Sequence, residues 1–277
     1  MPKPSNQNNW MTRVPSQHHQ FERIEAFFSN HSYKPHRHDT YAIGQTLSGV
    51  QNFHYRGALR HSLAGMTMVL HPDEKHDGEA GTTAGFHYRM IYLEPALIQS
   101  ILQGKPLPFI QQGLSQDPRL FQATQNLLLH KHLDTLEEED ALFDLATRLC
   151  EVSDSKLQNT KTFDYRAAET AREYILAYPQ ENLSLKDLEQ QTDRDRWSLS
   201  RDFRLLFGTS PHRYMTMRRL ESVKAYLSQG ESLVNAAIRA GFFDQSHMTR
   251  HFIKAFGLSP AQWKKMNAIH QFNHTRK

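Results

Sequence analysis

An internal repeat in the last third of the chain limits most strongly what this sequence can fold into. The segment RWSLSRDFRLLFGTSP at Arg196–Pro211 returns 49 residues later as QSHMTRHFIKAFGLSP at Gln245–Pro260. The two copies share an Arg, a Phe, a Phe-Gly pair and a Ser-Pro pair at equivalent places. Upstream, Leu185–Leu188 matches Leu233–Ala236 at an offset of 48, so the second copy has one extra residue in its internal turn. One small supersecondary unit therefore occurs twice.

Each copy has the parts of a helix-turn-helix. A short helix, predicted over Leu185–Gln191 or Leu233–Ala240, leads through a turn to a second helix over Arg196–Phe207 or Gln245–Phe256. Gly241 permits the backbone of the second turn. Apolar residues of the second helices recur every three to four positions, which predicts a buried face. They are Leu199, Phe203 and Leu206 in the first copy and Met248, Phe252 and Phe256 in the second.

The opposite faces of these helices are polar. They carry Trp197, Ser200, Arg201 and Arg204 in the first copy and Gln245, Ser246, Thr249 and Arg250 in the second. Arg, Gln, Ser and Thr are side chains that contact base edges and phosphates. From Asp164 to the end, the chain has 18 Lys and Arg against 12 Asp and Glu, a net charge of +6. Together these features predict double-stranded DNA as a partner, and a helical bundle without a DNA role is the lesser alternative.

Further helices connect and follow the two copies. Ser210-Pro211 is an N-cap followed by proline at the first helical position. The apolar stripe after it, Tyr214, Met217, Leu220 and Leu227, predicts a long helix that separates the two units. Ser259-Pro260 repeats the start signal for a final helix that contains Trp263.

The first half of the chain has a different period. Four short apolar stretches between turn signals predict β-strands of a barrel or sandwich: Tyr41–Leu47, Gln51–Tyr55, Thr67–Leu70 and Phe86–Leu93. Two leucine-rich helices are predicted to follow over residues 117–152, and their leucines predict a homodimer contact, with packing onto the barrel as the alternative. The polar segment SDSKLQNTK separates this half from the helical one. We expect a flexible arm over 1–20, an effector-sensing or dimerisation domain over 21–152, a linker over 153–163 and a DNA-binding domain over 164–277.

Composition excludes several classes of protein. The single cysteine, Cys150, cannot form a disulfide within the chain, which fits a reducing cytosol. No run of 18 or more apolar residues and no signal peptide is visible, so we expect a cytoplasmic protein without a membrane partner. No Ser/His/Asp order, phosphate loop or pair of catalytic carboxylates stands out, and we predict no catalytic residues.

Histidines mark the predicted barrel. His36 and His38 form an HxH pair, whose side chains share one face of an extended segment. His76 follows the turn Pro72–Lys75, and sheet pairing can bring it near the HxH pair. The pattern over Phe21–Leu93 resembles the cupin barrel, in whose metal-binding members a carboxylate follows HxH by a few residues. Ala42, Ile43 and Gln45 stand there instead, so we expect no metal and no cofactor. The prediction is an effector pocket with polar groups from His36, His38, Tyr41 and His76.

Residues 165–266 resemble the DNA-binding domain of the AraC/XylS family of transcription regulators. The segment Gly241–Pro260 is close to that family's signature. The resemblance implies an α+β multidomain chain: an N-terminal cupin-like β-barrel with following helices, then an all-α domain with two helix-turn-helix units. It also implies two recognition helices in successive major grooves, which adds Arg196 and His247 to the predicted DNA contacts. An activator that engages RNA polymerase is the commoner mode in the family.

The first copy departs from the family pattern at two places. Glu189 stands where a small residue is usual, and Thr192-Asp193 replaces a turn glycine. Asp tolerates left-handed geometry, so the turn can still form.

The leading hypothesis is therefore a DNA-binding regulator that responds to a small-molecule effector in the barrel. One alternative is a cupin-type metalloenzyme with a fused helical domain, and the missing carboxylate argues against it. Another alternative is a DNA-binding protein whose barrel only dimerises.

Overall fold

A computed structural model of the 277-residue chain describes residues 9–16, 21–29, 32–129, 133–154 and 163–265. The chain forms two compact units, one built mainly from residues before Phe163 and the other mainly from Phe163 onward. The arm and linker boundaries predicted from sequence stay predictions, and most of the linker lies outside the described residues.

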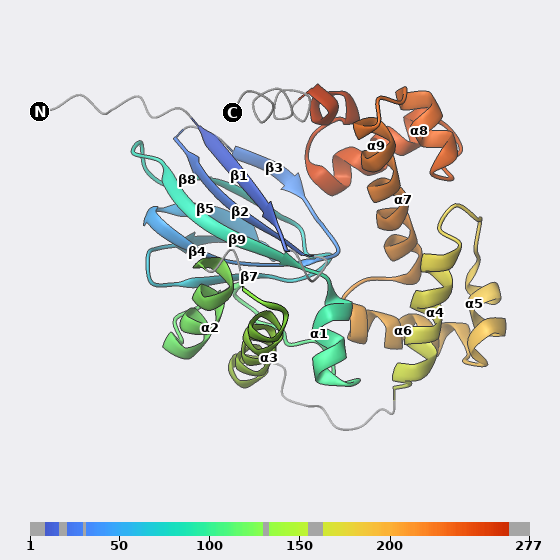
Figure 1. Cartoon of the computed structure of the whole chain (residues 1–277), viewed down its shortest axis with the longest axis horizontal. Helices are drawn as coiled ribbons and strands as arrows, with labels where there is room; N and C mark the ends of the chain where they lie inside the picture. Colours follow the sequence, from blue (N-terminus) through green and yellow to red (C-terminus); the bar gives the residue numbers. More distant parts are fainter. Residues whose placement is uncertain (1–8, 17–20, 30–31, 130–132, 155–162, 266–277) are drawn as a thin grey trace, which may run out of the picture. The chain divides into compact units, whose positions relative to one another are not determined.

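Two β-sheets form the frame of the N-terminal unit (Figure 1). The six-stranded sheet has the order β1-β2-β9-β4-β7-β10, and the four-stranded sheet has the order β3-β8-β5-β6. The strands of the first sheet are β1 Trp10–Pro15, β2 Phe21–Phe28, β9 Phe86–Leu93, β4 Tyr41–Gly49, β7 Thr67–Leu70 and β10 Leu114–Ser115. Those of the second are β3 Ser32–His36, β8 His76–Ala80, β5 Gln51–Tyr55 and β6 Ala58–Ser62.

The four strands predicted from apolar stretches are confirmed as β4, β5, β7 and β9. Burial alternates along β9, where Phe86, Tyr88 and Met90 are buried and the residues between them are partly exposed. The β4 residues Tyr41–Thr46 and all of β7 are buried on both faces of the sheet. The connection from β4 to β5 needs Gly49, whose φ is +75°. A Cβ at this position would lie 2.1 Å from the carbonyl oxygen of Gly85, so no other residue fits the close approach of these two segments.

The N-terminal arm is in part a strand, and the prediction of a flexible segment over 1–20 was wrong for Trp10–Pro15. β1 pairs antiparallel with β2, from Trp10 opposite Phe27 to Pro15 opposite Glu22. Because the segment is short and carries Thr12 and Arg13 between apolar residues, its strand character depends on pairing with β2, which composition does not reveal.

Successive side chains of the six-stranded sheet point to opposite faces, so the two faces pack into two different hydrophobic cores. On one face, Ala42, Met68 and Met90 pack with Phe53 and Tyr55 of the four-stranded sheet. On the other face, the sheet packs against three helices, α1 Pro95–Leu102, α2 Pro118–Leu129 and α3 Thr135–Val152 (Figure 1). The sheet residues of this second core are Tyr41, Ile43, Val69, Ile91 and Leu93.

The leucine-striped region therefore packs mostly onto the barrel. Six leucines of these helices are buried in the second core, and Leu133 packs against it partly buried. The six are Leu120, Leu127, Leu128, Leu142, Leu145 and Leu149. Leu136 is 68% exposed. Three helices, rather than the predicted two, follow the strands in the described part of this unit.

An ion pair is buried beside the second core. Glu138 of α3 accepts a hydrogen bond from Arg23 of β2 at 3.1 Å and another from the Ser16 hydroxyl at 2.6 Å. Arg23 also donates to the Leu127 carbonyl at 2.6 Å. Within the acidic run Glu137–Asp140 only Glu138 is buried, because its carboxylate pairs with the buried guanidinium of Arg23.

Among the described residues from Phe163 onward, all regular secondary structure is helical. The helices are α4 Tyr165–Ala177, α5 Leu185–Thr192, α6 Arg196–Phe207, α7 Pro211–Ser228, α8 Leu233–Arg239 and α9 Gln245–Phe256, followed by helical residues 260–265. The long α7 runs between a group formed by α4, α5 and α6 and a group formed by α8 and α9 (Figure 1). As predicted, Ser210 caps α7 by accepting from the Arg213 amide, and Pro211 occupies its first turn.

Candidate functional site

The first helix-turn-helix consists of α5 and α6. Ser184 and Asp187 form a capping box at the start of α5. Asp193 ends the helix in the left-handed region, with φ at 50°, which confirms that this residue can replace the usual glycine of the turn. The Glu189 carboxylate accepts from the Arg196 amide at 3.3 Å. The two departures from the family pattern thus both support the start of α6.

One face of α6 is buried and the other is open. Leu199, Phe203 and Leu206 have no solvent-exposed surface, as their spacing predicted. Trp197 is 69% exposed, and the guanidinium of Arg196 lies 5.6 Å from its ring centroid. Arg204 is also exposed and donates to the Ser200 hydroxyl at 2.6 Å. Ser200 was predicted on the open face but is only 8% exposed, because it lies beneath Arg204 at the edge of the core face. Exposed arginine and aromatic side chains give α6 a surface suited to phosphates and bases.

Arg201 is held by a buried carboxylate that sequence reasoning missed. Asp202 is completely buried, and its Oδ1 accepts from Arg201 at 2.8 and 3.1 Å. Its Oδ2 accepts from Arg194 at 2.8 Å and from the backbone amide of Asp164 at 3.0 Å. Asp202 therefore joins the turn before α6, α6 itself and the start of α4.

The second helix-turn-helix consists of α8 and α9. Gly241 lies between them with φ at +84°, and a Cβ there would lie 2.6 Å from the carbonyl oxygen of Gln180. Asp244 caps α9 by accepting from the His247 amide at 2.6 Å. Met248 and Phe252 are buried as predicted, and Phe256, the third residue of the predicted core face, is partly buried and packs against the same core. Glycine is required here both for the turn and for close packing against the segment before α5.

The open face of α9 is polar. Ser246 and Arg250 are exposed, and Gln245 and Thr249 are partly exposed. In the equivalent position to Asp202 of α6, this helix has His251 instead, so Arg250 has no acidic neighbour at the next residue. The side chain of Arg250 is thus presented differently from that of Arg201.

His247 and His251 form a pair on α9. Their Nε2 atoms lie 3.1 Å apart, and Phe242 packs against both rings. Burial, together with the nearby His247 and Lys254, lowers the pKa of His251 to about 4. His251 is therefore neutral near pH 7, and one imidazole donates a hydrogen bond to the other.

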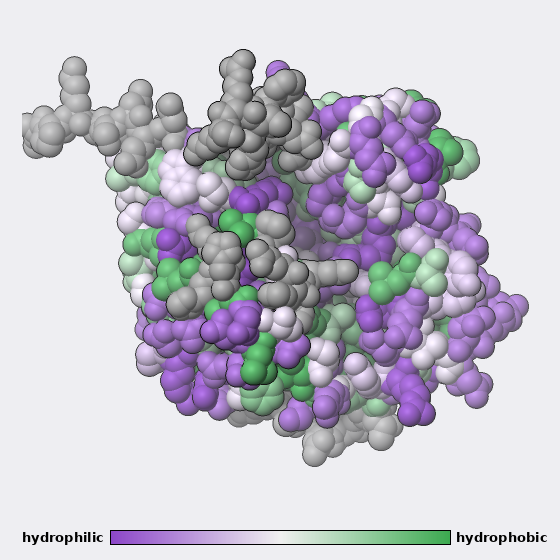
Figure 2. Space-filling model, viewed as in Figure 1, coloured by the Kyte–Doolittle hydropathy of each residue, from purple (hydrophilic) through white to green (hydrophobic). Residues whose placement is uncertain are grey.

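Large apolar side chains also lie exposed around the two units. Phe243, just before α9, is 88% exposed, and Val234 and Ile238 of α8 are 53% and 56% exposed. The face of the helical unit seen in Figure 2 is nevertheless mostly hydrophilic. Sequence reasoning missed Phe243, although its neighbour Phe242 is buried and only one of two adjacent residues can face the core.

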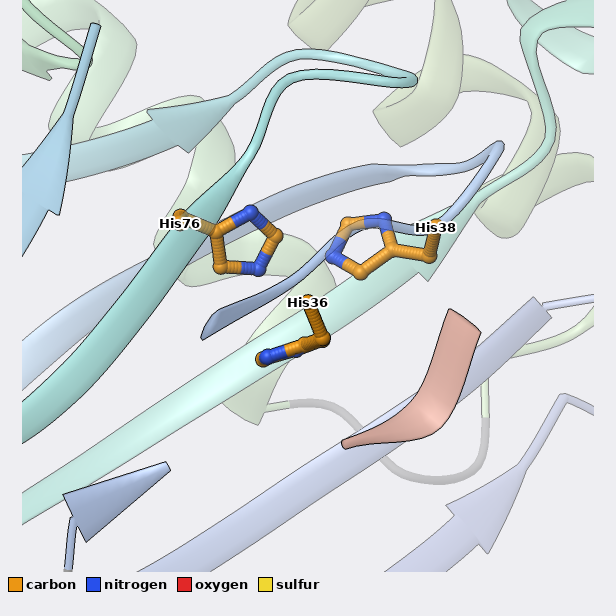
Figure 3. A group of neighbouring side chains, drawn as sticks. All are labelled: His36, His38 and His76. Carbon is orange, nitrogen blue, oxygen red and sulfur yellow. The ribbon is translucent and has the colours of Figure 1, made fainter. Parts of the chain in front are cut away.

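Three of the four residues predicted to line the effector pocket lie together (Figure 3). His36 ends β3 and His76 begins β8, the neighbouring strand in the four-stranded sheet. His38 follows β3 by two residues. One imidazole nitrogen from each of the three lies within 4.8 Å of the others. The sheet pairing that the sequence analysis invoked therefore brings the third histidine to the HxH pair.

Tyr41 does not belong to that group of side chains. It is buried in the core between the six-stranded sheet and the helices, where its hydroxyl donates to the Pro108 carbonyl at 2.7 Å and lies 3.1 Å from Nε2 of His71. His71 contacts the same carbonyl, and burial lowers its pKa to about 4. The successive side chains of β4 point to opposite faces, and Tyr41 takes the helix-facing side.

A membrane-spanning helix is not found among the described residues.

Two family models match the chain. The AraC-like ligand binding domain matches residues 18–146, and a helix-turn-helix domain matches residues 188–266. The first covers the barrel with most of α3, and the second covers both recognition helices.

Known regulators are similar in sequence. An uncharacterised regulator of the helix-turn-helix type, YbfI of Bacillus subtilis, is 27% identical over 83% of this chain and 84% of its own length. The multiple antibiotic resistance protein MarA of Escherichia coli is 27% identical over 33% of this chain and 78% of its own length.

One solved structure is similar in fold over nearly the whole chain. An apo form of ToxT from Vibrio cholerae matches with a TM-score of 0.62 at 13% identity, over 92% of this chain and 99% of ToxT. The order of a ligand-binding barrel before two helix-turn-helix units is thus found by sequence and by fold, and the chain belongs to the AraC family of transcription regulators.

Proposed function

We propose that this regulator recognises a specific DNA site through α6 and α9, and that a small-molecule effector bound by the N-terminal unit controls this recognition. The observation that carries the proposal is the shared design of the two helices. Each follows a tight turn, packs the apolar side chains of one face into a core, and presents arginine and other polar side chains on its opposite face. Helices of this kind read the major groove with side chains near their N-terminal ends.

The proposed contacts are those predicted from sequence. In α6 they are Arg196, Trp197, Ser200, Arg201 and Arg204; in α9 they are Gln245, Ser246, His247, Thr249 and Arg250. Arg250 is exposed and suits bidentate recognition of guanine. Arg201 shares a buried carboxylate with Arg194, which supports a phosphate contact at a constant position.

The proposed effector site lies at His36, His38 and His76. These side chains converge in Figure 3, and two of them are at least nine-tenths buried, which suits a small ligand better than a macromolecule. ToxT has been crystallised with an unsaturated fatty acid. That finding supports a small organic effector as a class, and the two chains are 12% identical, so it does not name the effector of this one.

The proposal also covers the protein partners and the cellular location of the regulator. RNA polymerase is the proposed protein partner at the promoter, where the regulator acts as an activator, and a second copy of the chain is the proposed dimer partner. The relatives are transcription regulators, which supports a role without catalysis. The cytoplasm is the proposed location, because the proposed target is DNA.

Selection of DNA fragments by the intact protein tests the proposal. We expect enrichment of a site with two conserved segments about 10 base pairs apart, because two recognition helices on one face of DNA enter successive turns of the major groove. The combined variant Ser246→Ala, Thr249→Ala, Arg250→Ala removes the polar face of α9 and should lose one segment.

A control variant, Arg119→Ala, removes a positive charge from α2, where the side chain is 58% exposed. It should enrich the same site as the wild type. Recovery of unrelated fragments by the wild-type protein would contradict sequence-specific binding.

A further inference from the structure

We propose that His36, His38 and His76 bind one divalent transition-metal ion, with Zn²⁺ as the ion that best fits the ligand set. The inference deepens the proposed function, because it names a ligand for the proposed effector site. Metal binding itself does not depend on the proposed function, but a role of the metal in regulation rests on it. Its test needs neither DNA nor an organic effector.

Geometry is the first argument. In a tetrahedral zinc site with Zn–N bonds of about 2.0–2.1 Å, two ligand nitrogens lie ~3.4 Å apart. Here one nitrogen from each of the three imidazoles lies within 4.8 Å of the other two. Closing the remaining gap takes shifts of about 1 Å, which small rotations of imidazole side chains supply. The side chains come from a strand end, the residues that follow it and the start of the neighbouring strand, so the backbone holds them close together.

The hydrogen bonding of His76 is the second argument. Its Nδ1 lies 2.9 Å from the backbone carbonyl of Glu74. A carbonyl oxygen only accepts hydrogen bonds, so Nδ1 carries the proton and Nε2 keeps its lone pair. Metal-binding histidines commonly donate their other N–H to a carbonyl or carboxylate in this way, which orients the ring and fixes the tautomer. In a neutral His76 imidazole this tautomer leaves Nε2 as the nitrogen that can bind an ion.

Burial and ligand type are the third argument. His38 and His76 are 8% and 5% exposed, whereas His36 is only partly buried. Neutral imidazoles suit Zn²⁺, Ni²⁺, Cu²⁺ and Fe²⁺, and three of them with one open position form a known type of zinc site. The carboxylate whose absence argued against a metal at the level of sequence is not needed, because the third histidine supplies the third ligand.

The test uses the intact protein after removal of metals with a chelator. Co²⁺ is titrated first because its visible absorption reports ligand geometry, and Zn²⁺ is then added to displace it. We expect saturation at one ion per chain and displacement by Zn²⁺. His38→Ala and His76→Ala should each weaken binding by at least ~100-fold, since even the loss of outer-shell partners costs 10–100-fold.

Two further variants locate the site. His61→Ala removes an exposed imidazole of β6, and His251→Ala breaks the histidine pair of α9. Both should bind Co²⁺ like the wild type. His76→Asp keeps a ligand atom at the same position and should bind with a changed Co²⁺ spectrum, which a purely structural role of His76 would not produce.

Circular dichroism without metal checks that each variant is folded. If His38→Ala or His76→Ala is not, the same loss is measured with His36→Ala, whose side chain is the least buried of the three. The inference is overturned if the wild type shows no saturable binding, or if binding survives the loss of these histidines. Neither outcome touches the DNA-fragment selection, so failure of the metal site is distinguishable from failure of the proposed function.

Discussion

The buried carboxylate of Asp202 gives the sharpest quantitative prediction for the first recognition helix. Asp202→Asn keeps the size of the side chain but replaces one accepting oxygen with an amide that donates. The two oxygens now accept four hydrogen bonds, from Arg201, Arg194 and the Asp164 amide. In the variant at least one of these donors faces another donor, and the negative charge between two arginines is lost.

The expected cost follows from the exposure of the partners. Breaking a fully buried ion pair costs roughly 3–5 kcal/mol. Arg194 and Arg201 are 27% and 40% exposed, so water partly compensates them. We therefore expect a loss of about 2 kcal/mol, which corresponds to roughly 30-fold faster opening by the relation of 1.36 kcal/mol for each factor of ten.

Native-state hydrogen exchange of the intact protein measures this loss locally. Peptides from α4 and α6 should exchange about 30-fold faster in Asp202→Asn, while peptides from the barrel should not change. The control is Glu221→Gln in α7, whose carboxylate pairs with Lys224 and is 44% exposed. Such a surface pair contributes less than about 1 kcal/mol. If Asp202→Asn accelerates exchange of α6 no more than the control does, the buried carboxylate does not hold this helix as argued.

Three other predictions follow from the structure. Burial lowers the pKa of His71 to about 4, against an unfolded value near 6.5, so only the unfolded state gains a proton as pH falls from about 6.5 to 4. The free energy of unfolding of the barrel should thus decrease over that window by up to about 3 kcal/mol, and urea titrations of His71→Gln should show a flatter pH dependence. Leu136 and Phe143 of α3 are 68% and 60% exposed and seven residues apart, so they share one face and are predicted to form the dimer contact. In analytical ultracentrifugation the wild type should be a dimer and Leu136→Ser, Phe143→Ser a monomer; a monomeric wild type at micromolar concentration would exclude this contact. Affinity for a selected DNA site should fall linearly with the logarithm of salt concentration, because the C-terminal part carries a net charge of +6, and a flat plot would be incompatible with phosphate contacts.

Local patterns allowed the recognition helices to be predicted residue by residue. The bounds of α6 and α9 agree with the prediction, because apolar spacing and turn signals act within one turn of the helix. Six described strands were not predicted individually: β1, β2, β3, β6, β8 and β10. Most of them are short or carry polar residues, and all are stabilised by pairing with other strands, which local patterns do not reveal.

Contacts between residues far apart in the sequence determine the parts of the candidate sites that local patterns could not predict. His36 and His38 are visible as a pair, but only the adjacency of β3 and β8 brings His76 to them. Tyr41 was grouped with these histidines because it is close in sequence, and the alternation of β4 directs it to the other core. Asp202 and Glu138 look like surface acids in the sequence, because their arginine partners are identified only by tertiary packing.

Comparison of the two helix-turn-helix units on DNA tests the central claim most directly. Binding sites are selected with the wild type, Arg250→Ala and Arg201→Ala, and the base frequencies are compared. We expect Arg250→Ala to cost on the order of 1–3 kcal/mol and to relax the preference at one position in one half of the site. Arg201→Ala, whose guanidinium is held by Asp202, should weaken binding to all sequences alike. Loss of affinity without any change of base preference in Arg250→Ala would contradict the account that α9 reads the DNA sequence through this arginine.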